Sequence, residues 1–231
     1  NNQMDNLNYI PLRATSQYSL LEGAMKIENI VKKAINHNIP AVGLTDRNNL
    51  FGALEFSEKL IDKGIQPIIG CNLSFYDQKN SGSIVCLAKN EQGYKNLIKL
   101  SSEFFLTNDD ERLSLNRLSE LNEGLILLTG GYGSLINNYL KSGLKKNALE
   151  LTKKLNSIFQ DRIYIEIQRM GKDNFENDLL DIANDIRVPV VASNTIFFES
   201  KDRFTSHDAL IAIKDSTTVN NSNREILTNE L

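Results

Sequence analysis

The sequence predicts an α/β fold, a distorted (β/α)7 barrel whose strands are mostly parallel and are surrounded by helices. Strand-like apolar runs alternate with amphipathic helical segments along the 231 residues, which is typical of a largely parallel sheet. The strands are short, apolar and evenly distributed, which favours a barrel over an open sheet. No glycine-rich phosphate loop follows the first strand, which argues against a dinucleotide-binding fold.

Seven core strands are predicted, and we expect helical connections between them. They are Tyr9–Leu12 and residues 41–45, 67–70, 84–88, 125–129, 163–168 and 189–193. The run EGLILLTGG, which contains the fifth strand, is apolar for long enough to be covered on both faces of the sheet.

Helices are predicted where apolar residues recur every three or four positions. The segment KIENIVKKAIN at 26–36 has this spacing, and Pro40 then opens the strand that follows it. The other predicted helices are 50–64, 90–105, 134–143, 144–159, 174–186 and 206–214. The glycines of TGGYG at 129–133 lack the Lys-Ser/Thr of a phosphate-binding loop, so we interpret them as a tight turn.

Composition excludes several classes of protein. A net charge of −3 provides no basic surplus for a phosphate-binding surface. No apolar run is long enough to cross a membrane and the N-terminus is polar, so we expect no membrane partner, no secretion signal and a cytoplasmic location. We expect one domain over 1–231, with 214–231 as a polar tail.

The cysteines and histidines are interpreted as structural residues. Cys71 and Cys86 lie in apolar runs without a CxxC spacing, which indicates small buried hydrophobes. His37 lies at a predicted helix end and His207 near a helix start, where capping or packing is the simpler role.

In barrels of this kind, chemistry takes place at the carboxyl ends of the strands. The residues at those positions are Arg13, Thr15, Glu22, Asp46, Arg47, Asn72, Thr129, Gly130, Gln168, Arg169, Met170, Asn194, Thr195 and Phe197. The set is polar but poor in metal ligands, because only Asp46 and Glu22 carry carboxylates and none of these side chains is an imidazole. Arg13 and Arg47 add positive charge where a cation would bind.

Several segments together resemble a known family. They are YIPLRATSQYSLLEG, VGLTDRNNLFGALEF, GIQPIIGCNLSF, LAKNEQGYKNLIKLSS, LNEGLILLTGG, IYIEIQRMG, VPVVASNTIFF and SHDALIAIKD, in this order. The set resembles the PHP (polymerase and histidinol phosphatase) domain at the N-terminus of the bacterial replicative DNA polymerase III alpha subunit. One fragment alone would be unspecific, but the ordered set spans almost the whole chain.

The chain departs from this family where the family binds metal. The H-x-H-x-H run corresponds to Pro11, Arg13 and Thr15, and the T-D-H-G motif to residues 45–48, with Asp46 retained and Arg47 in the place of histidine. The other ligand positions correspond to Asn72, Ser83, Met170, Thr195 and Phe197. We interpret these positions, with Glu22, as a vestigial metal site without a catalytic residue or a metal. A rebuilt site with fewer metals, or a barrel that never held a site, are the alternatives.

The resemblance implies a parent chain that carries out template-directed DNA synthesis with magnesium held by aspartates of a polymerase body absent from this sequence. We expect an excised, catalytically inactive scaffold, with Met4 as a candidate native start and the tail at 214–231 leading towards the polymerase body. The implied partners are the remainder of the alpha chain and the proofreading 3′–5′ exonuclease subunit, with DNA contacted only through the holoenzyme.

Two further expectations follow from the resemblance. The alternative function is a free-standing or residual metal-dependent PHP phosphoesterase or exonuclease, with a trinuclear metal site in its free-standing form. Exposed apolar residues on the outer helices, around Phe104 and Phe105, are a candidate contact surface, and core packing is the alternative interpretation of the same residues.

Overall fold

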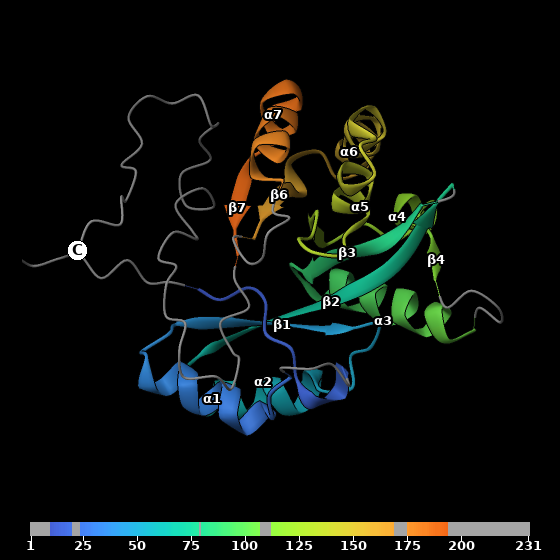
Figure 1. Cartoon of the computed structure of the whole chain (residues 1–231). Coiled ribbons are helices and arrows are strands. Elements are labelled where there is room, and N and C mark those ends of the chain that lie inside the picture. Colours follow the sequence, from blue (N-terminus) through green and yellow to red (C-terminus); the bar gives the residue numbers. More distant parts are fainter. Residues whose placement is uncertain (1–9, 20–23, 79, 107–111, 169–174, 194–231) are drawn as a thin grey trace, which may run out of the picture.

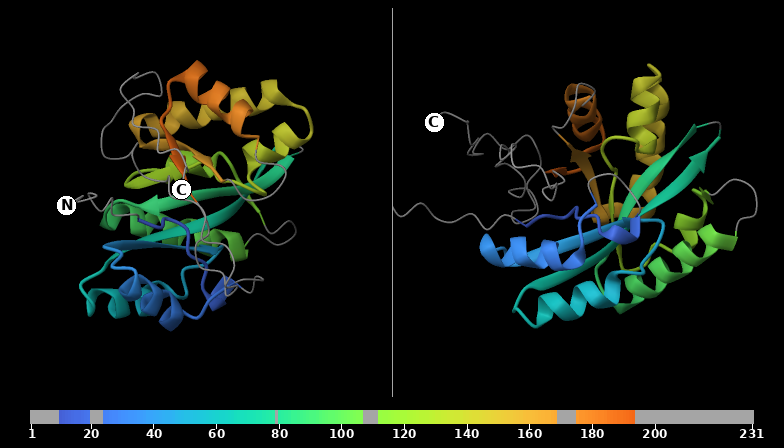
Figure 2. Two further views of the ribbon diagram at one scale, coloured as in Figure 1. Left: turned by 60° about the vertical axis from the view of Figure 1, so that its left-hand side comes forward. Right: turned by 60° about the horizontal axis from the view of Figure 1, so that its bottom comes forward.

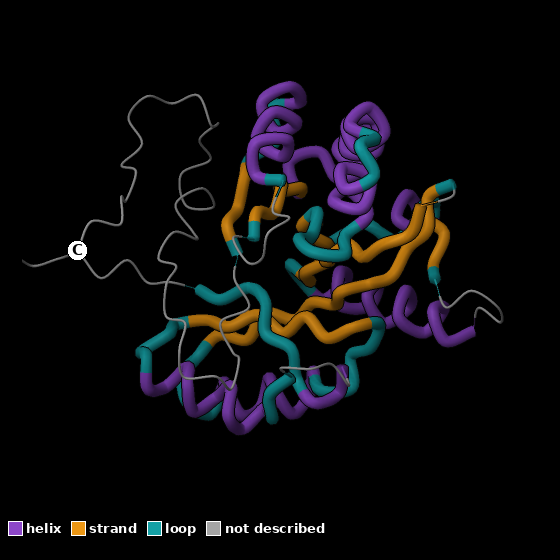
Figure 3. Tube along the Cα trace, viewed as in Figure 1, coloured by secondary structure: helices purple, strands orange, loops and turns teal. Residues whose placement is uncertain are grey.

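The structure is a computed structural model that describes residues 10–19, 24–78, 80–106, 112–168 and 175–193 (Figures 1 and 3). The helices are α1 (Ile27–Asn36), α2 (Ala53–Ile61), α3 (Glu91–Leu106), α4 (Arg117–Glu120), α5 (Leu135–Lys141), α6 (Lys145–Phe159) and α7 (Glu176–Ile186), with 3₁₀ turns η1 (Gln17–Ser19) and η2 (Gln160–Arg162). The strands are β1 (Ala41–Arg47), β2 (Gln66–Asp77), β3 (Asn80–Ala88), β4 (Leu113–Ser114), β5 (Leu125–Leu128), β6 (Ile163–Ile167) and β7 (Val190–Ala192).

The strands form one curled sheet in the order β1-β2-β3-β5-β6-β7, with β4 paired to β2. The pairs β1/β2, β2/β4, β5/β6 and β6/β7 are parallel, whereas β3 is antiparallel to both of its neighbours. The helices lie outside the curl, with α1, α2 and α3 on one side and α5, α6 and α7 on the other (Figures 1 and 2). The predicted distorted α/β barrel with mostly parallel strands is therefore confirmed.

The first predicted strand is shifted and irregular. Tyr9 lies outside the described residues, and Ala14 forms an isolated parallel bridge with Leu44 of β1. Gly43 donates its N–H to the Pro11 carbonyl at 2.7 Å and accepts from the Ala14 N–H at 2.9 Å. A Cβ at position 43 would lie 2.4 Å from the Leu12 carbonyl oxygen, so this close approach requires glycine. Residues 10–14 thus extend the sheet beyond β1 without forming a regular strand.

The expectation of helical connections throughout is wrong between the third and fourth predicted strands. These strands extend into a long hairpin, β2 and β3, which pairs Gly70 with Leu87 at one end and Asp77 with Asn80 at the other. Buried Leu73 and Phe75 alternate with less buried neighbours, which is the period of a strand that continues past residue 70. A tight turn can join only antiparallel strands, which is why β3 reverses direction.

The remaining elements follow the predictions closely. Helices α1, α3, α5, α6 and α7 and strands β5, β6 and β7 lie within the predicted ranges or one residue from them. Gly130 and Gly133 of the predicted turn have φ of +84° and +77°, and Ser134 then caps α5 by accepting the Asn137 N–H. His37 is the C-cap residue of α1, whereas His207 and the predicted helix at 206–214 lie outside the described residues. No described helix is long and apolar enough to cross a membrane.

Alternation along the strands divides the core between the two faces of the sheet. On the outer face, one cluster joins β1 to α1 and α2, and a larger cluster joins β2, β3, β5 and β6 to α3, α5, α6 and α7. On the inner face, Leu12, Val85, Leu87, Leu128 and Val191 form a separate cluster. Because Leu12 and Val191 come from opposite edges of the sheet, this inner cluster holds the curl together.

Candidate functional site

The candidate site lies at the carboxyl ends of β1, β5 and β6 and beside the middle of β2, where the inner apolar cluster gives way to polar side chains. Of the predicted vestigial metal-site positions, seven are described by the structure, namely Pro11, Arg13, Thr15, Asp46, Arg47, Asn72 and Ser83. The other four, Glu22, Met170, Thr195 and Phe197, lie outside the described residues. We expect the carboxyl ends of the strands to gather at one mouth of the barrel, and the place of Thr195 beside Arg13 at this mouth stays a prediction.

The centre of the site is an ion pair between Arg13 and Glu166. The Arg13 Nη1 atom lies 3.0 Å from Glu166 Oε1 and 2.9 Å from Oε2, and the two side chains are 14% and 0% exposed. The Ser193 hydroxyl donates to Glu166 Oε1, and the Glu166 N–H donates to Thr129 Oγ1 at 3.0 Å. This network connects the N-terminal edge segment with β6 and the end of β7, so it joins the two edges of the curled sheet.

Glu166 was missed in the sequence, although a signal for it exists. In IYIEIQ, Ile163, Ile165 and Ile167 pack in the outer cluster, while Tyr164 packs against the inner one. A strand alternates its faces, so Glu166 shares the inner face with Tyr164. A carboxylate at an inner position of a strand covered on both faces needs a charged partner. The sequence alone does not identify that partner, because Arg13 is 153 residues away.

Asp46, the carboxylate near the end of β1, is held by serines. Its Oδ1 atom accepts from the Ser16 N–H and the Ser19 hydroxyl, both at 2.7 Å, and its Oδ2 atom accepts from the Ser16 hydroxyl at 2.6 Å. Ser19 in turn accepts the Arg47 N–H at 3.0 Å. Asp46 is 1% exposed, so these bonds satisfy a carboxylate that water hardly reaches. Its role in the structure is to fix the turn η1 against β1.

The remaining described positions do not converge on one point. Arg47 is exposed at the end of β1. Asn72 Oδ1 and the neighbouring Thr45 Oγ1 are buried and find no hydrogen-bond partner among the described residues. The Ser83 N–H donates to the Gly133 carbonyl at 3.0 Å and so ties β3 to the glycine turn. These groups could orient a polar ligand, but they provide no nucleophile paired with a base.

The described residues do not fit the metal site that the family resemblance implies. The Arg13 guanidinium occupies one of the predicted ligand positions and contacts the Glu166 carboxylate, and both oxygens of Asp46 accept hydrogen bonds from serines. Two cations about 4 Å apart repel by roughly 4 kcal/mol at intermediate dielectric. Among the residues that the structure describes, no group of three or more His, Cys, Asp or Glu side chains could hold a metal ion.

The two cysteines are inert core residues, as predicted. Cys71 and Cys86 face each other across the β2/β3 pair, are free and are fully buried. Burial raises the pKa of both thiols, that of Cys86 to about 12. A thiol with such a pKa carries almost no reactive thiolate at neutral pH.

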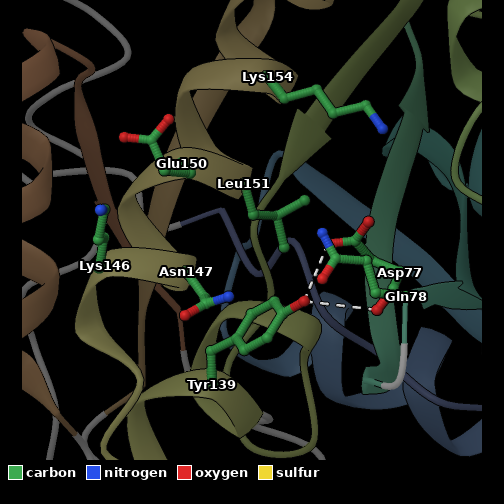
Figure 4. Close-up of a pocket in the computed structure, with 8 residues that line it drawn as sticks. All are labelled: Asp77, Gln78, Tyr139, Lys146, Asn147, Glu150, Leu151 and Lys154. Carbon is green, nitrogen blue, oxygen red and sulfur yellow. Dashed lines mark hydrogen bonds between the residues drawn. The ribbon is translucent and has the colours of Figure 1, made fainter.

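A separate hollow of about 470 Å³ opens between the end of the β2–β3 hairpin and helices α5 and α6 (Figure 4). The Tyr139 hydroxyl donates to Asp77 Oδ2 at 3.0 Å inside it. Lys146, Glu150 and Lys154 line it from α6 with charges of both signs. None of the predicted site positions contributes to this hollow, so we place the candidate site at the mouth of the barrel.

Comparison with known proteins identifies the family to which this chain belongs. The model of the PHP domain family matches residues 11–170, and the chain belongs to this family. Two solved structures share the fold. An amidohydrolase from Chromobacterium violaceum has a TM-score of 0.59 at 11% identity, covering 87% of this chain and 92% of its own. A two-domain protein from Bacteroides vulgatus that contains a predicted PHP-like metal-dependent phosphoesterase has a TM-score of 0.51 at 12% identity, covering 81% of this chain and 51% of its own.

Several relatives in sequence are DNA polymerase III alpha subunits. That of Rickettsia prowazekii is 38% identical over 91% of this chain and 18% of its own length. Those of Caulobacter vibrioides and Buchnera aphidicola are 37% and 33% identical, over 96% and 95% of this chain and 21% and 20% of their own lengths. The chain therefore spans about a fifth of the length of the relatives it matches.

Proposed function

We propose that this chain is the N-terminal PHP domain of a bacterial replicative DNA polymerase III alpha subunit. In this proposal the longer polypeptide carries out template-directed DNA synthesis, and the domain is a scaffold without hydrolytic activity of its own. It braces the remainder of the alpha chain and docks the proofreading 3′–5′ exonuclease subunit. The likeness to polymerase subunits over more than nine tenths of this chain supports the assignment.

The observation that carries the scaffold role is the Arg13–Glu166 pair. A guanidinium bonded to both carboxylate oxygens neutralises the buried charge at the mouth and joins the two edges of the sheet. In a metalloenzyme of this fold, metal–ligand bonds would help both to neutralise buried carboxylates and to join the edges of the sheet. A barrel that is held together by its own side chains keeps its shape for binding partners without needing a metal.

The finer parts of the proposal concern cofactors, DNA and location. We assign magnesium to the polymerase body, and we assign DNA contact to the holoenzyme, because a net charge of −3 does not favour a phosphate-binding surface. We also propose a cytoplasmic location, where chromosomal DNA is replicated in bacteria. We also assign the vestigial metal positions at Glu22, Met170, Thr195 and Phe197 to the same mouth as Arg13.

A second candidate function is a metal-dependent phosphoesterase, which the fold shared with the Bacteroides vulgatus protein favours. The side chains present argue against it, because the positions that would carry imidazoles hold Pro11, Arg13 and Thr15. Phosphomonoester hydrolysis or 3′–5′ exonuclease turnover that a chelator removes and Asp46→Ala abolishes would establish the second candidate instead.

The test of the first candidate uses the longer polypeptide. Primer extension with magnesium is expected from that polypeptide. In a titration, the 231-residue chain should bind the cognate exonuclease subunit with a dissociation constant in the micromolar range or below. Binding of primer-template DNA at physiological salt should be negligible in the same titration. Tight DNA binding without affinity for the subunit would refute the docking role.

A further inference from the structure

Two phenylalanines stack on the outer surface of the molecule. Phe51, in the turn before α2, and Phe105, in the last turn of α3, have ring centroids 6.0 Å apart and an interplanar angle of 22°. They nevertheless remain 68% and 58% exposed. Leu54, three residues after Phe51, and Leu106, next to Phe105, are 69% and 75% exposed. We call Phe51, Leu54, Phe105 and Leu106 the aromatic patch.

The aromatic patch is held in place from beneath. Phe104 contacts Phe105 edge-to-face at 5.4 Å and packs against the large outer core cluster. Helix α3 buries Leu97 and Leu100 in the same cluster, so the exposed rings stand on a rigid base. The sequence predicted either a contact surface or core packing around Phe104 and Phe105, and the structure shows one of each. Phe104 packs against the core, whereas Phe105 lies at the surface.

The size and chemistry of the aromatic patch are those of an interface. Its four side chains expose on the order of 400–500 Å² of apolar area, at the upper end of what a monomer shows without a partner. The charged residues next in sequence are paired internally, Glu103 with Arg117 and Glu55 with Lys59. With these charges neutralised, the patch offers little attraction for DNA phosphates, whereas rigid aromatic anchors suit a protein partner.

We propose that the aromatic patch is the surface on which the remainder of the longer polypeptide packs, an inference that rests on the proposed function. The relatives extend for about four fifths of their length beyond the matched region, so the occupant is part of the same polypeptide. Permanently buried interfaces are more apolar than transient ones, and the four side chains of the aromatic patch include no polar group.

The test is site-resolved thiol labelling of the full-length polypeptide. Leu54→Cys and Leu106→Cys introduce a thiol into the aromatic patch while keeping both stacked rings. Leu144→Cys, at a residue 47% exposed between α5 and α6, is the matched control. Native Cys71 and Cys86 are buried and should not react. Labelling by a maleimide is followed by peptide mass spectrometry, and primer extension is measured on the same preparations.

We expect both patch thiols to react at least about tenfold more slowly than the control thiol in the full-length polypeptide. Equal labelling in a preparation that extends primers normally overturns this inference and leaves the proposed function intact, whereas absence of primer extension by the wild-type polypeptide overturns the proposed function itself. Protection that appears only on adding the exonuclease subunit, or that disappears on dilution, overturns the inference in favour of a separate subunit or a second copy. Protection already present in the 231-residue chain overturns it in favour of a cover within that chain.

Discussion

Removing the cation from the Arg13–Glu166 pair should destabilise the protein strongly. In Arg13→Met, a side chain of similar length replaces the guanidinium, and Glu166 keeps only the Ser193 hydroxyl on its carboxylate among the described partners. Because Glu166 is 0% exposed, water does not replace the lost cation. Breaking a buried ion pair by removing one partner costs about 3–5 kcal/mol, and the 14% exposure of Arg13 places this case near the lower limit.

Substitution of the other partner, Glu166, should lower the free energy of unfolding by less. In Glu166→Gln, the amide oxygen still accepts from Arg13, and the guanidinium lies close enough to the opening for partial hydration, so we expect a loss of about 1–3 kcal/mol. The double variant Arg13→Met/Glu166→Gln has no buried charge left, so its loss should be smaller than the sum of the two single losses by about 1–3 kcal/mol. Arg47→Met, which removes an exposed arginine at the end of the neighbouring strand, is the control and should change stability by less than about 0.5 kcal/mol.

Urea unfolding followed by circular dichroism measures these differences, provided that the slope of the transition is the same for all variants. The reasoning fails if Arg13→Met is as stable as Arg47→Met. It also fails if the stability loss of the double variant equals the sum of the two single losses, because Arg13 and Glu166 would then not stabilise each other.

Two other predictions concern the neighbouring hydrogen bonds and the hollow. Asp46→Asn replaces an acceptor of the Ser16 hydroxyl by a donor and should cost about 1–3 kcal/mol in urea unfolding, whereas an unchanged midpoint would contradict the structural role of this carboxylate. Burial and the Asp77 carboxylate raise the pKa of Tyr139 from 10.0 to about 12. The unfolded chain therefore releases the Tyr139 proton at lower pH than the folded chain does. The contribution of Tyr139 to the free energy of unfolding is complete below pH 10 and is lost as the pH rises through about 12. Tyr139→Phe should make the free energy of unfolding fall less steeply over this alkaline range, and the same fall in wild type and variant would contradict the prediction.

Local sequence patterns determined most of the secondary structure and the chemical character of the mouth. The apolar spacing of residues 26–36 and 144–159 marks helices α1 and α6 within one residue, since this periodicity is a property of the segment itself. The glycines at 130 and 133 mark the turn before α5, because each adopts a positive φ that glycine tolerates. The absence of an imidazole at positions 11, 13 and 15 is likewise a fact of the sequence, independent of how the chain folds.

The tertiary structure decided how distant residues meet. Arg13 pairs with Glu166 only because the sheet curls until its two edges approach, and this curl is the sum of many strand contacts rather than a property of either segment. The direction of β3 depended on a tight turn within a polar stretch that resembles a loop. Phe104 and Phe105 are adjacent and chemically identical, yet Phe104 packs against the core, whereas Phe105 stacks on Phe51 at the surface. A helix turns by about 100° per residue, so this difference depends on which face α3 presents to the sheet, and only the packed structure fixes that face.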